Sequence, residues 1–304
     1  MKAANKLAHV LFVVNPISGD IEKSDVLDLI KDFCATHKIQ YAFFETTGQN
    51  DLDQLKTLLK TENYEAVFAV GGDGTSHLVG SALIHSEVAL GIIPMGSGNG
   101  LSKDLGIPQD AEEALEVMLD PQFRIIDALS VNNSICVHLT DLGFNALVVK
   151  KFNEGEKRGA SSYAIVALQE FLSYEPKLYH IETDHGSFSG RAFMVTITNA
   201  NAFGSNATIN PTGIIDDGKF EVCILEPFPK GAAIELLYRM YHDSIDKSVY
   251  TRIISCRQAE VLNQDHEEVQ VDGEHMETGE KITIKLLPKS LKILTPRLKT
   301  QVAY

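Results

Sequence analysis

Up to about residue 120, the chain alternates between short apolar runs and stretches whose apolar residues recur with helical spacing. A near-continuous apolar run of this length is typical of a buried strand, and the recurring spacing is typical of an amphipathic helix. Strands of this kind separated by such helices favour a parallel sheet covered on both faces. The sequence therefore predicts an α/β N-terminal domain with a Rossmann-like parallel sheet. Its strands are expected at residues 7–14, 39–45, 65–70 and 88–94.

From about residue 125 the pattern changes to short strand-like segments separated by turn residues. Residues 125–144 predict a hairpin that turns at Asn132-Asn133. One helix is expected next, with Tyr163 and Phe171 on the same face, and a later helix at 230–242 interrupts a series of further strands. This succession predicts a mostly antiparallel β C-terminal domain. The expected boundaries are 1–124 for the α/β domain, completed by 294–304, and 125–293 for the β-rich domain.

The composition narrows the classes of partner. The formal net charge of −14 opposes nucleic-acid phosphates, and no basic stripe with interleaved aromatic residues occurs, so no nucleic acid is expected. The same charge gives little attraction to anionic lipid headgroups, so a membrane contact would have to be apolar or local. The four cysteines lie far apart without a CxxC pair, which indicates reduced core thiols in a cytoplasmic protein. The histidines show no zinc-site spacing.

The segment Gly71-Gly72-Asp73-Gly74-Thr75 follows the third apolar run and opens a helix-like pattern. Glycines let backbone N–H groups converge on a phosphate, and a helix N-terminus adds a favourable dipole. The chain has no GxxxxGK[ST] loop, so no lysine would neutralise the phosphates. Asp73 fits such a cradle if Mg²⁺ lies between its carboxylate and the phosphates. The alternative is a plain strand-to-helix turn with an Asp cap.

Two more glycine-containing turns follow strands in the same half, at residues 15–20 and 94–100. Loops that follow parallel strands open at the same carboxyl edge of a sheet, where ligands bind. Each turn alone could be a tight connection. The three together are a stronger signal of a ligand site at that edge than one turn alone.

The motifs also occur in a recognisable order: NPISG (15–19), GGDGT (71–75), PMGSGNGLSKDLGIP (94–108), DLGFNA (141–146), DDGKFEV (216–222) and VQVDGE (269–274). In order and spacing this set resembles the diacylglycerol kinase catalytic-domain family, which includes bacterial soluble lipid kinases and the sphingosine and ceramide kinases. The resemblance covers nearly the whole chain. GGDGT alone is shared with the more distantly related NAD kinases, whereas the full set is specific to the lipid kinases.

The resemblance implies roles for particular residues. In that family Asp272 matches the proposed general base, with Glu274 nearby, and the segment around Asp217 holds a structural Mg²⁺ through a carboxylate and two backbone carbonyls. The matching metal ligands are Ile214, Asp217 and Lys219. The matching ATP-site residues are Asn15, Ser18, Gly19, Thr46, Gly71, Gly72, Asp73, Gly74, Thr75 and Ser97.

Local sequence leaves alternatives open at two of these positions. Asp272-Gly273 is by itself more typical of a hairpin turn, and Asp217-Gly218 is also a common turn pair. Only the order of the motifs favours a catalytic and a metal-binding role. One departure concerns Gly100, which stands where many diacylglycerol-type members carry an acidic residue. The run GSGN (96–99) is closer to sphingosine-kinase-like members, so the acceptor lipid is left open between the two types.

Together these features predict an ATP-dependent lipid kinase that phosphorylates a hydroxyl of diacylglycerol or of a sphingoid-type alcohol, with Mg²⁺ as cofactor. The alternatives are a NAD kinase-like enzyme and a nucleotide-binding regulatory protein without transfer activity. The β-domain motifs DDGKF and VQVDGE argue against a NAD kinase. The expected partners are a lipid substrate and a transiently contacted membrane surface, for a cytoplasmic protein peripheral to the membrane. A homodimer is compatible with the resemblance.

Overall fold

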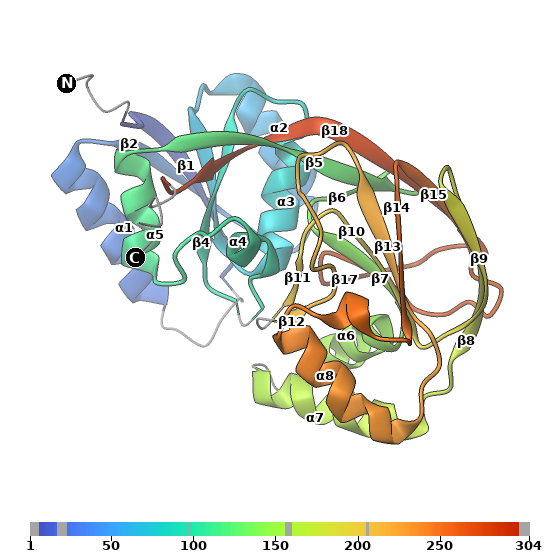
Figure 1. The fold of residues 1–304 in the computed structure, drawn as a ribbon. Helices are drawn as coiled ribbons and strands as arrows, with labels where there is room; N and C mark the ends of the chain where they lie inside the picture. Colours follow the sequence, from blue (N-terminus) through green and yellow to red (C-terminus); the bar gives the residue numbers. More distant parts are fainter. Residues whose placement is uncertain (1–5, 17–22, 97, 156–159, 205–206, 298–304) are drawn as a thin grey trace, which may run out of the picture. The chain divides into compact units, whose positions relative to one another are not determined.

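The computed structural model describes residues 6–16, 23–96, 98–155, 160–204 and 207–297 (Figure 1). The chain divides into two compact units. Unit 1 comprises Met1–Gly96, Leu105–Ile125 and Leu291–Tyr304, and unit 2 comprises Ser97–Asp104 and Ile126–Ser290.

Unit 1 is an α/β domain built on a parallel sheet. Its first four strands are β1 (His9–Val14), β2 (Gln40–Glu45), β3 (Ala66–Gly71) and β4 (Ala89–Pro94). They run parallel in the order β2-β1-β3-β4, which confirms the predicted N-terminal fold class. The helices of this unit are α1 (Lys23–His37), α2 (Asp51–Thr61), α3 (Asp73–Leu83), α5 (Ala111–Glu116) and the short η1 (Val117–Leu119).

The core of unit 1 explains why these segments form strands. Every residue of β3 and β4 is buried, as expected for parallel strands covered on both faces. Phe12 of β1 and Phe68 of β3 pack together with Ile30 of α1 in one apolar cluster. The Phe68 ring also lies against Gly91, where a Cβ atom would come within 2.3 Å of it. Only glycine therefore fits at that position of β4.

Unit 2 contains mostly antiparallel strands, as the sequence predicts. One sheet has the order β14-β13-β10-β7-β16-β17, and its neighbouring strands are antiparallel. A second group of strands pairs in the order β18-β15-β8-β9, and its neighbouring strands are also antiparallel. Strand β18 spans Lys281–Thr295. The strands are β6 (Ser134–Cys136), β7 (Leu139–Gly143), β8 (Lys177–Thr183), β9 (Gly186–Ala192), β10 (Met194–Thr198), β11 (Ala202–Gly204), β12 (Ala207–Thr208), β13 (Phe220–Leu225), β14 (Thr251–Cys256), β15 (Gln258–Leu262), β16 (Val269–Val271) and β17 (Glu274–Met276).

Two strands contribute residues to both units. They are β5 (Gln122–Val131) and the 15-residue β18 (Lys281–Thr295). The first part of β18 pairs antiparallel with β15, and Ile293 near its end pairs parallel with Leu90 of β4. The parallel sheet of unit 1 therefore includes the end of β18, the last strand among the described residues.

In the first part of unit 2, the predicted hairpin and the helix with Tyr163 and Phe171 are present, and one further helix was not predicted. The predicted hairpin turn is present, because β5 and β6 pair around Asn132 and Asn133, whose φ angles are 46° and 72°. The single helix expected near Phe171 is in fact two helices, α6 (Phe144–Glu154) and α7 (Ala160–Ser173). Gly143, with φ of 84°, turns the chain out of β7 so that an apolar segment continues as a helix and not as a strand.

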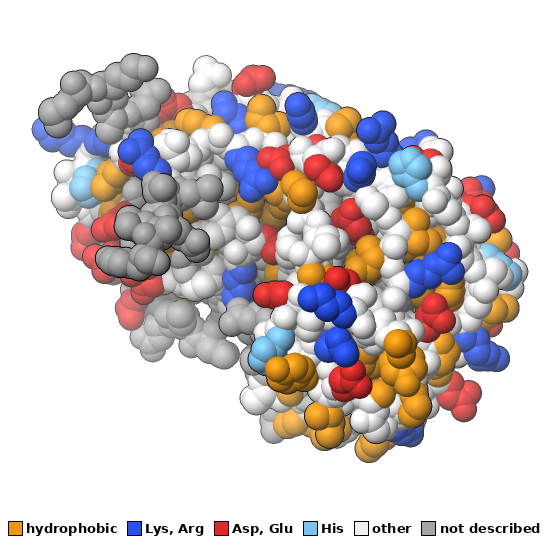
Figure 2. Space-filling model, viewed as in Figure 1, with side chains coloured by type: hydrophobic (Ala, Val, Ile, Leu, Met, Phe, Trp, Pro, Cys, Tyr) orange, Lys and Arg blue, Asp and Glu red, His pale blue; other side chains and the backbone are white. Residues whose placement is uncertain are grey.

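The remaining helical segments of unit 2 are short. They are α4 (Gly100–Asp104), η2 (Lys230–Ala232), α8 (Ala233–Tyr241) and η3 (Ile245–Lys247). Figure 2 shows hydrophobic side chains gathered where Figure 1 draws α7 and α8. Among the described residues, no helix is both long and apolar enough to cross a membrane.

The cysteines are free and buried, as the sequence predicts. Burial raises the pKa of the Cys34 thiol to about 11 and that of Cys256 to about 12. It also raises the pKa of Cys136 and Cys223 well above the ordinary range. The four thiols are therefore protonated core side chains at neutral pH.

Candidate functional site

In unit 1, the loops that follow the parallel strands begin at one edge of the sheet. The N–H of Asn15, just after β1, donates to the Val70 carbonyl oxygen of β3, at 3.5 Å. The N–H of Thr46, just after β2, donates to the Val14 carbonyl oxygen at 2.9 Å. The structure therefore places Asn15 and Thr46 at the same carboxyl edge as the segment Gly71–Thr75, which follows β3.

The glycines of this segment allow close approach of its neighbours. A Cβ atom on Gly71 would lie 2.2 Å from the hydroxyl oxygen of Thr75. A Cβ atom on Gly72 would lie 3.3 Å from the Cα atom of Gly96, in the loop that follows β4. Two of the three glycine-containing turns are therefore in direct contact. Ser18, Gly19 and Ser97 lie outside the described residues.

Thr75 carries an unsatisfied hydroxyl at the start of α3. Gly72 is the N-cap residue and supplies no side-chain cap, and the N–H groups of Thr75 and Ser76 both donate to the Gly72 carbonyl oxygen. The Thr75 side chain is only 3% exposed, and its hydroxyl has no hydrogen-bond partner among the described residues. A buried polar group without a partner costs about 1–3 kcal/mol. A helix N-terminus favours anions, so a phosphate oxygen is a fitting partner for this hydroxyl.

The loop after β2 is held by Asp51, the first residue of α2. Its carboxylate accepts hydrogen bonds from the N–H groups of Thr47 and Gly48, at 2.9 and 2.8 Å. Desolvation acts to raise the pKa of Asp51, but these hydrogen bonds outweigh it and the pKa is lowered. The Asp51 carboxylate therefore shapes the loop that begins at Thr46.

In unit 2, the three expected metal ligands lie in one tight turn. The Ile214 carbonyl oxygen accepts a hydrogen bond from the N–H of Asp217 at 3.4 Å, and the Asp217 carboxylate accepts one from the N–H of Lys219 at 3.0 Å. Among the described residues, no group of three or more His, Cys, Asp and Glu side chains could hold a metal. A cation at this turn would therefore rely on backbone carbonyls beside one carboxylate. Such an all-oxygen set suits a hard cation such as Mg²⁺.

Asp127, in β5, anchors that turn and was not singled out from the sequence. Its fully buried carboxylate accepts hydrogen bonds from the N–H of Gly218 at 2.7 Å and from the N–H of Lys289 at 2.6 Å. Its own N–H donates to the Ile215 carbonyl oxygen. The sequence feature that could have identified Asp127 is its position as an acidic residue inside an apolar strand pattern. A carboxylate buried in a strand requires hydrogen-bond partners.

Asp272, between β16 and β17, resembles Asp127 in that its buried carboxylate accepts hydrogen bonds from backbone N–H groups. The residue is 2% exposed, has φ of 50°, and accepts hydrogen bonds on its carboxylate from the N–H groups of Val137, His138 and Leu139, at 2.8–3.0 Å. Backbone bonds to a carboxylate are charge-assisted and strong. They attach the turn at Asp272 to the segment that leads into β7. Glu274, two residues later, is exposed.

A buried polar network lies beneath this turn. The Gln270 side chain accepts a hydrogen bond from the N–H of Gly273 at 2.6 Å and donates to the Asp141 carboxylate at 2.5 Å. Asn145 and Thr196 also donate to Asp141. Burial raises the pKa of Asp141, although these hydrogen bonds act in the opposite direction. The network fixes the side chains beneath the Asp272 turn.

Packing explains why glycine stands at position 100, where many diacylglycerol-type members carry an acidic residue. A Cβ atom on Gly100 would lie 2.4 Å from the imidazole ring of His138. That ring is 3.0 Å from the carboxylate of Asp104, which also accepts a hydrogen bond from the N–H of Ala202. The first residue of α4 therefore has no room for the acidic side chain found in many diacylglycerol-type members.

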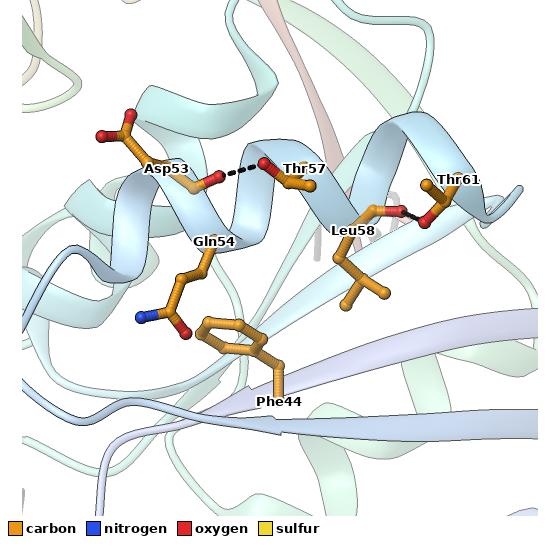
Figure 3. Close-up of a pocket in the computed structure, with 6 residues that line it drawn as sticks. All are labelled: Phe44, Asp53, Gln54, Thr57, Leu58 and Thr61. Carbon is orange, nitrogen blue, oxygen red and sulfur yellow. Dashed lines mark hydrogen bonds between the residues drawn. The ribbon is translucent and has the colours of Figure 1, made fainter.

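One cavity of about 550 Å³ lies between β2 and α2 and contains none of the predicted site residues (Figure 3). Two of its hydroxyl groups are already used, because Thr57 donates to the Asp53 carbonyl oxygen and Thr61 to that of Leu58. Because none of the predicted site residues lines this cavity, it is separate from the candidate site. Its lining residues are Phe44, Asp53, Gln54, Thr57, Leu58 and Thr61.

Comparison with known proteins agrees with this arrangement. Residues 9–131 match the model of the diacylglycerol kinase catalytic domain, and residues 139–295 match that of the YegS C-terminal NAD kinase beta sandwich-like domain. A probable lipid kinase YegS-like protein of Citrobacter koseri is 26% identical over 94% of this chain and 95% of its own length. An uncharacterized Synechocystis protein is also 26% identical, over 96% of this chain and 70% of its own length.

Solved structures show the same fold. A putative diacylglycerol kinase from Bacillus anthracis superposes with a TM-score of 0.79, covering 96% of this chain and 98% of that protein at 19% sequence identity. The two domain matches, which together span most of the sequence, confirm the family resemblance stated from the motifs. The chain belongs to the lipid kinase family that joins a diacylglycerol kinase catalytic domain to a YegS-type β-sandwich domain.

Proposed function

We propose that the protein is an ATP-dependent kinase that transfers the γ-phosphate to the hydroxyl of a lipid, either diacylglycerol or a sphingoid-type alcohol. The observation that carries the proposal is the buried, unpartnered hydroxyl of Thr75 beside two glycines at the start of α3. A triphosphate supplies acceptor atoms for this hydroxyl, at a helix N-terminus whose dipole favours anions. Membership of a lipid kinase family supports the acceptor class.

In this proposal the nucleotide lies at the carboxyl edge of the unit 1 sheet. The N-terminal amides of α3 and the Thr75 hydroxyl hold phosphate oxygens, and Asn15 and Thr46 line the site. Ser18, Gly19 and Ser97 are proposed to line it as well. Because the protein does little covalent work in phosphoryl transfer, holding the phosphates and excluding water are the main tasks of these residues.

We propose that Mg²⁺ acts at two places. Asp73 would hold the ion that accompanies the triphosphate, and the turn with Ile214, Asp217 and Lys219 would hold a structural ion. When bound beside phosphates, Mg²⁺ supplies the positive charge that the glycine turn lacks, since no lysine is present in that turn. Asp127 keeps the second turn in shape through its bond to the Gly218 N–H.

Asp272 is the proposed general base that accepts the proton of the lipid hydroxyl. Its carboxylate already accepts hydrogen bonds from backbone N–H groups, which raises a specific alternative. In that alternative Asp272 positions the turn, and the exposed carboxylate of Glu274 takes the proton. The variant Glu274→Gln distinguishes the two assignments: if Asp272 is the base, folded Glu274→Gln keeps transfer and Asp272→Asn loses it, and if Glu274 is the base, folded Glu274→Gln loses transfer.

The test of the function is labelled-ATP turnover with a mixed lipid extract, with the product identified by mass. A phosphorylated diacylglycerol or sphingoid alcohol supports the proposal and names the acceptor. NAD is included as an acceptor, because the NAD kinases share GGDGT. Phosphorylation of NAD alone, or ATP binding without transfer to any lipid, would contradict the proposal.

A further inference from the structure

The outward face of helix α7 is apolar. The side chains of Ile165, Leu168 and Leu172 are 58%, 63% and 62% exposed, and their spacing places them along one side of the helix. Glu170 is the one charged residue between Ala160 and Ser173. A surface helix normally turns charged and polar residues toward water. The exposed side of α7 therefore carries three large apolar side chains, with Ser161 and Gln169 among its exposed polar residues.

Helix α8 repeats this pattern. Its side chains at Ile234, Leu237, Tyr238 and Tyr241 are between 55% and 80% exposed and lie along one side. We call these four residues, with Ile165, Leu168 and Leu172, the α7/α8 surface. Figure 2 shows hydrophobic side chains gathered over these two helices.

The inner faces of both helices pack on one core cluster. Leu236 and Met240 of α8 are buried in the cluster that contains Phe193, and Phe171 of α7 packs against it. The Lys230 ammonium group, in the turn before α8, donates to the Leu172 carbonyl oxygen at 2.6 Å. The two helices are thus held by the same part of unit 2, and their apolar sides face solvent from there.

The charges on these helices and on the whole chain indicate which partner suits the α7/α8 surface. On α8, Glu235 and Arg239 form an ion pair at 2.8 Å, so within the described part of the chain Glu170 is the charged side chain of the two helices that has no ion pair. A second copy would bring another chain of net charge −14, and an anionic membrane would also repel this one. A zwitterionic bilayer presents no such opposition. Tyrosine beside leucine and isoleucine is also the composition that favours the membrane–water interface.

We propose that the α7/α8 surface docks onto the interfacial region of a zwitterionic lipid bilayer. The proposal rests on the proposed function, because a lipid kinase must reach an acceptor that is held in a bilayer. Docking through apolar side chains also suits a chain whose charge gives it no electrostatic attraction to a membrane.

The absence of tryptophan from the chain permits a direct test of insertion. The variant Leu168→Trp places one fluorophore on α7, and Ile125→Trp places one at a 51% exposed apolar position of unit 1. With phosphatidylcholine vesicles, we expect a blue shift and quenching by brominated acyl chains for Trp at 168 and neither at 125. Equal behaviour of the two variants, or no quenching at 168, overturns the proposal.

A second test measures binding of the full chain by sedimentation with sucrose-loaded phosphatidylcholine vesicles. The double variant Leu168→Glu/Leu237→Glu should lower the partition coefficient at least about tenfold. The milder Leu168→Ser/Leu237→Ser should lower it in the same direction if the glutamates perturb folding. Binding by the unmodified chain should persist at high salt, because it does not depend on charge. Unchanged binding by both double variants overturns the proposal.

Activity assays separate this proposal from the proposed function. On a short-chain diacylglycerol dissolved as monomers, the double variants should retain the turnover of the unmodified chain, and on vesicle-borne substrate they should lose it. Vesicle docking by an unmodified chain that phosphorylates no lipid would remove the proposed function and leave the docking surface. A dimer that dissociates in these variants, with no vesicle binding by the unmodified chain, would assign the surface to a second copy and overturn docking.

Discussion

The unpartnered hydroxyl of Thr75 makes a prediction in which stability and nucleotide binding change in opposite directions. The substitution Thr75→Val keeps the shape of the side chain and removes the hydroxyl. This hydroxyl is buried without a partner among the described residues. Its removal therefore relieves a desolvation penalty, and we expect the free energy of unfolding to rise by about 1–2 kcal/mol.

Binding of ATP should weaken in the same variant. A hydrogen bond to a charged group contributes about 1.5–3 kcal/mol, so loss of the bond from Thr75 to a phosphate oxygen corresponds to about a 10- to 150-fold increase in Kd. Calorimetric titration with ATP and Mg²⁺ measures this change. The thermal stabilisation that ATP gives to the unmodified protein should shrink in parallel, because that stabilisation depends on the Kd.

Ser81 supplies the matched control. Its side chain lies on the same helix, is 6% exposed, and carries a buried hydroxyl that also has no partner among the described residues. Ser81 is not one of the proposed ATP-site residues, so Ser81→Ala should raise stability and leave the Kd for ATP unchanged. If Thr75→Val binds ATP within about twofold of the unmodified chain, the Thr75 hydroxyl does not contact a phosphate and the reasoning is refuted.

Three further predictions address unit 2 and the core. Asp272→Asn leaves at least one backbone N–H without its carboxylate partner, so urea unfolding should show a loss of about 2–4 kcal/mol, and a loss below about 0.5 kcal/mol would contradict the anchoring role. Burial raises the pKa of Asp141, so its ionisation lowers stability as pH rises from about 4 through the folded-state pKa. The stability of Asp141→Asn relative to the unmodified chain should therefore increase over that window, and a constant difference would argue against an ionising buried carboxylate. The four buried thiols should react with a thiol reagent at pH 8 only after unfolding, and rapid reaction of the native protein would contradict their burial.

The parallel sheet could be predicted because its signal is local. β3 and β4 are buried along their whole length, and a strand buried on both faces leaves a continuous apolar run in the sequence. The glycine turn at 71–75 is equally local, because its conformation depends on adjacent residues. The extent of β18 was harder to predict, because Pro288 is expected to end a strand. The strand instead continues through Lys289, whose φ is 47° and whose N–H donates to Asp127.

The hydrogen bonds that hold the turns of the candidate site could not be predicted from local sequence. Asp127 bonds to Gly218, 91 residues away, and Asp272 bonds to the Val137 N–H, 135 residues away. Partners at such separations depend on how strands pair, and single-residue patterns do not encode that. The sequence did mark Asp272 and Asp217 through their motifs. It did not indicate that the Asp272 carboxylate is enclosed by backbone amides.

The division of β18 between the two units has a consequence for synthesis of the protein. Strands β1 to β4 of unit 1 are synthesised early, yet the segment that pairs with Leu90 is synthesised only after residues 126–290 of unit 2. Until then, β4 presents open backbone groups to which another chain could bind. A nascent or truncated N-terminal half is therefore exposed to aggregation, and the sheet of the first domain can be completed only once the end of β18 has been synthesised.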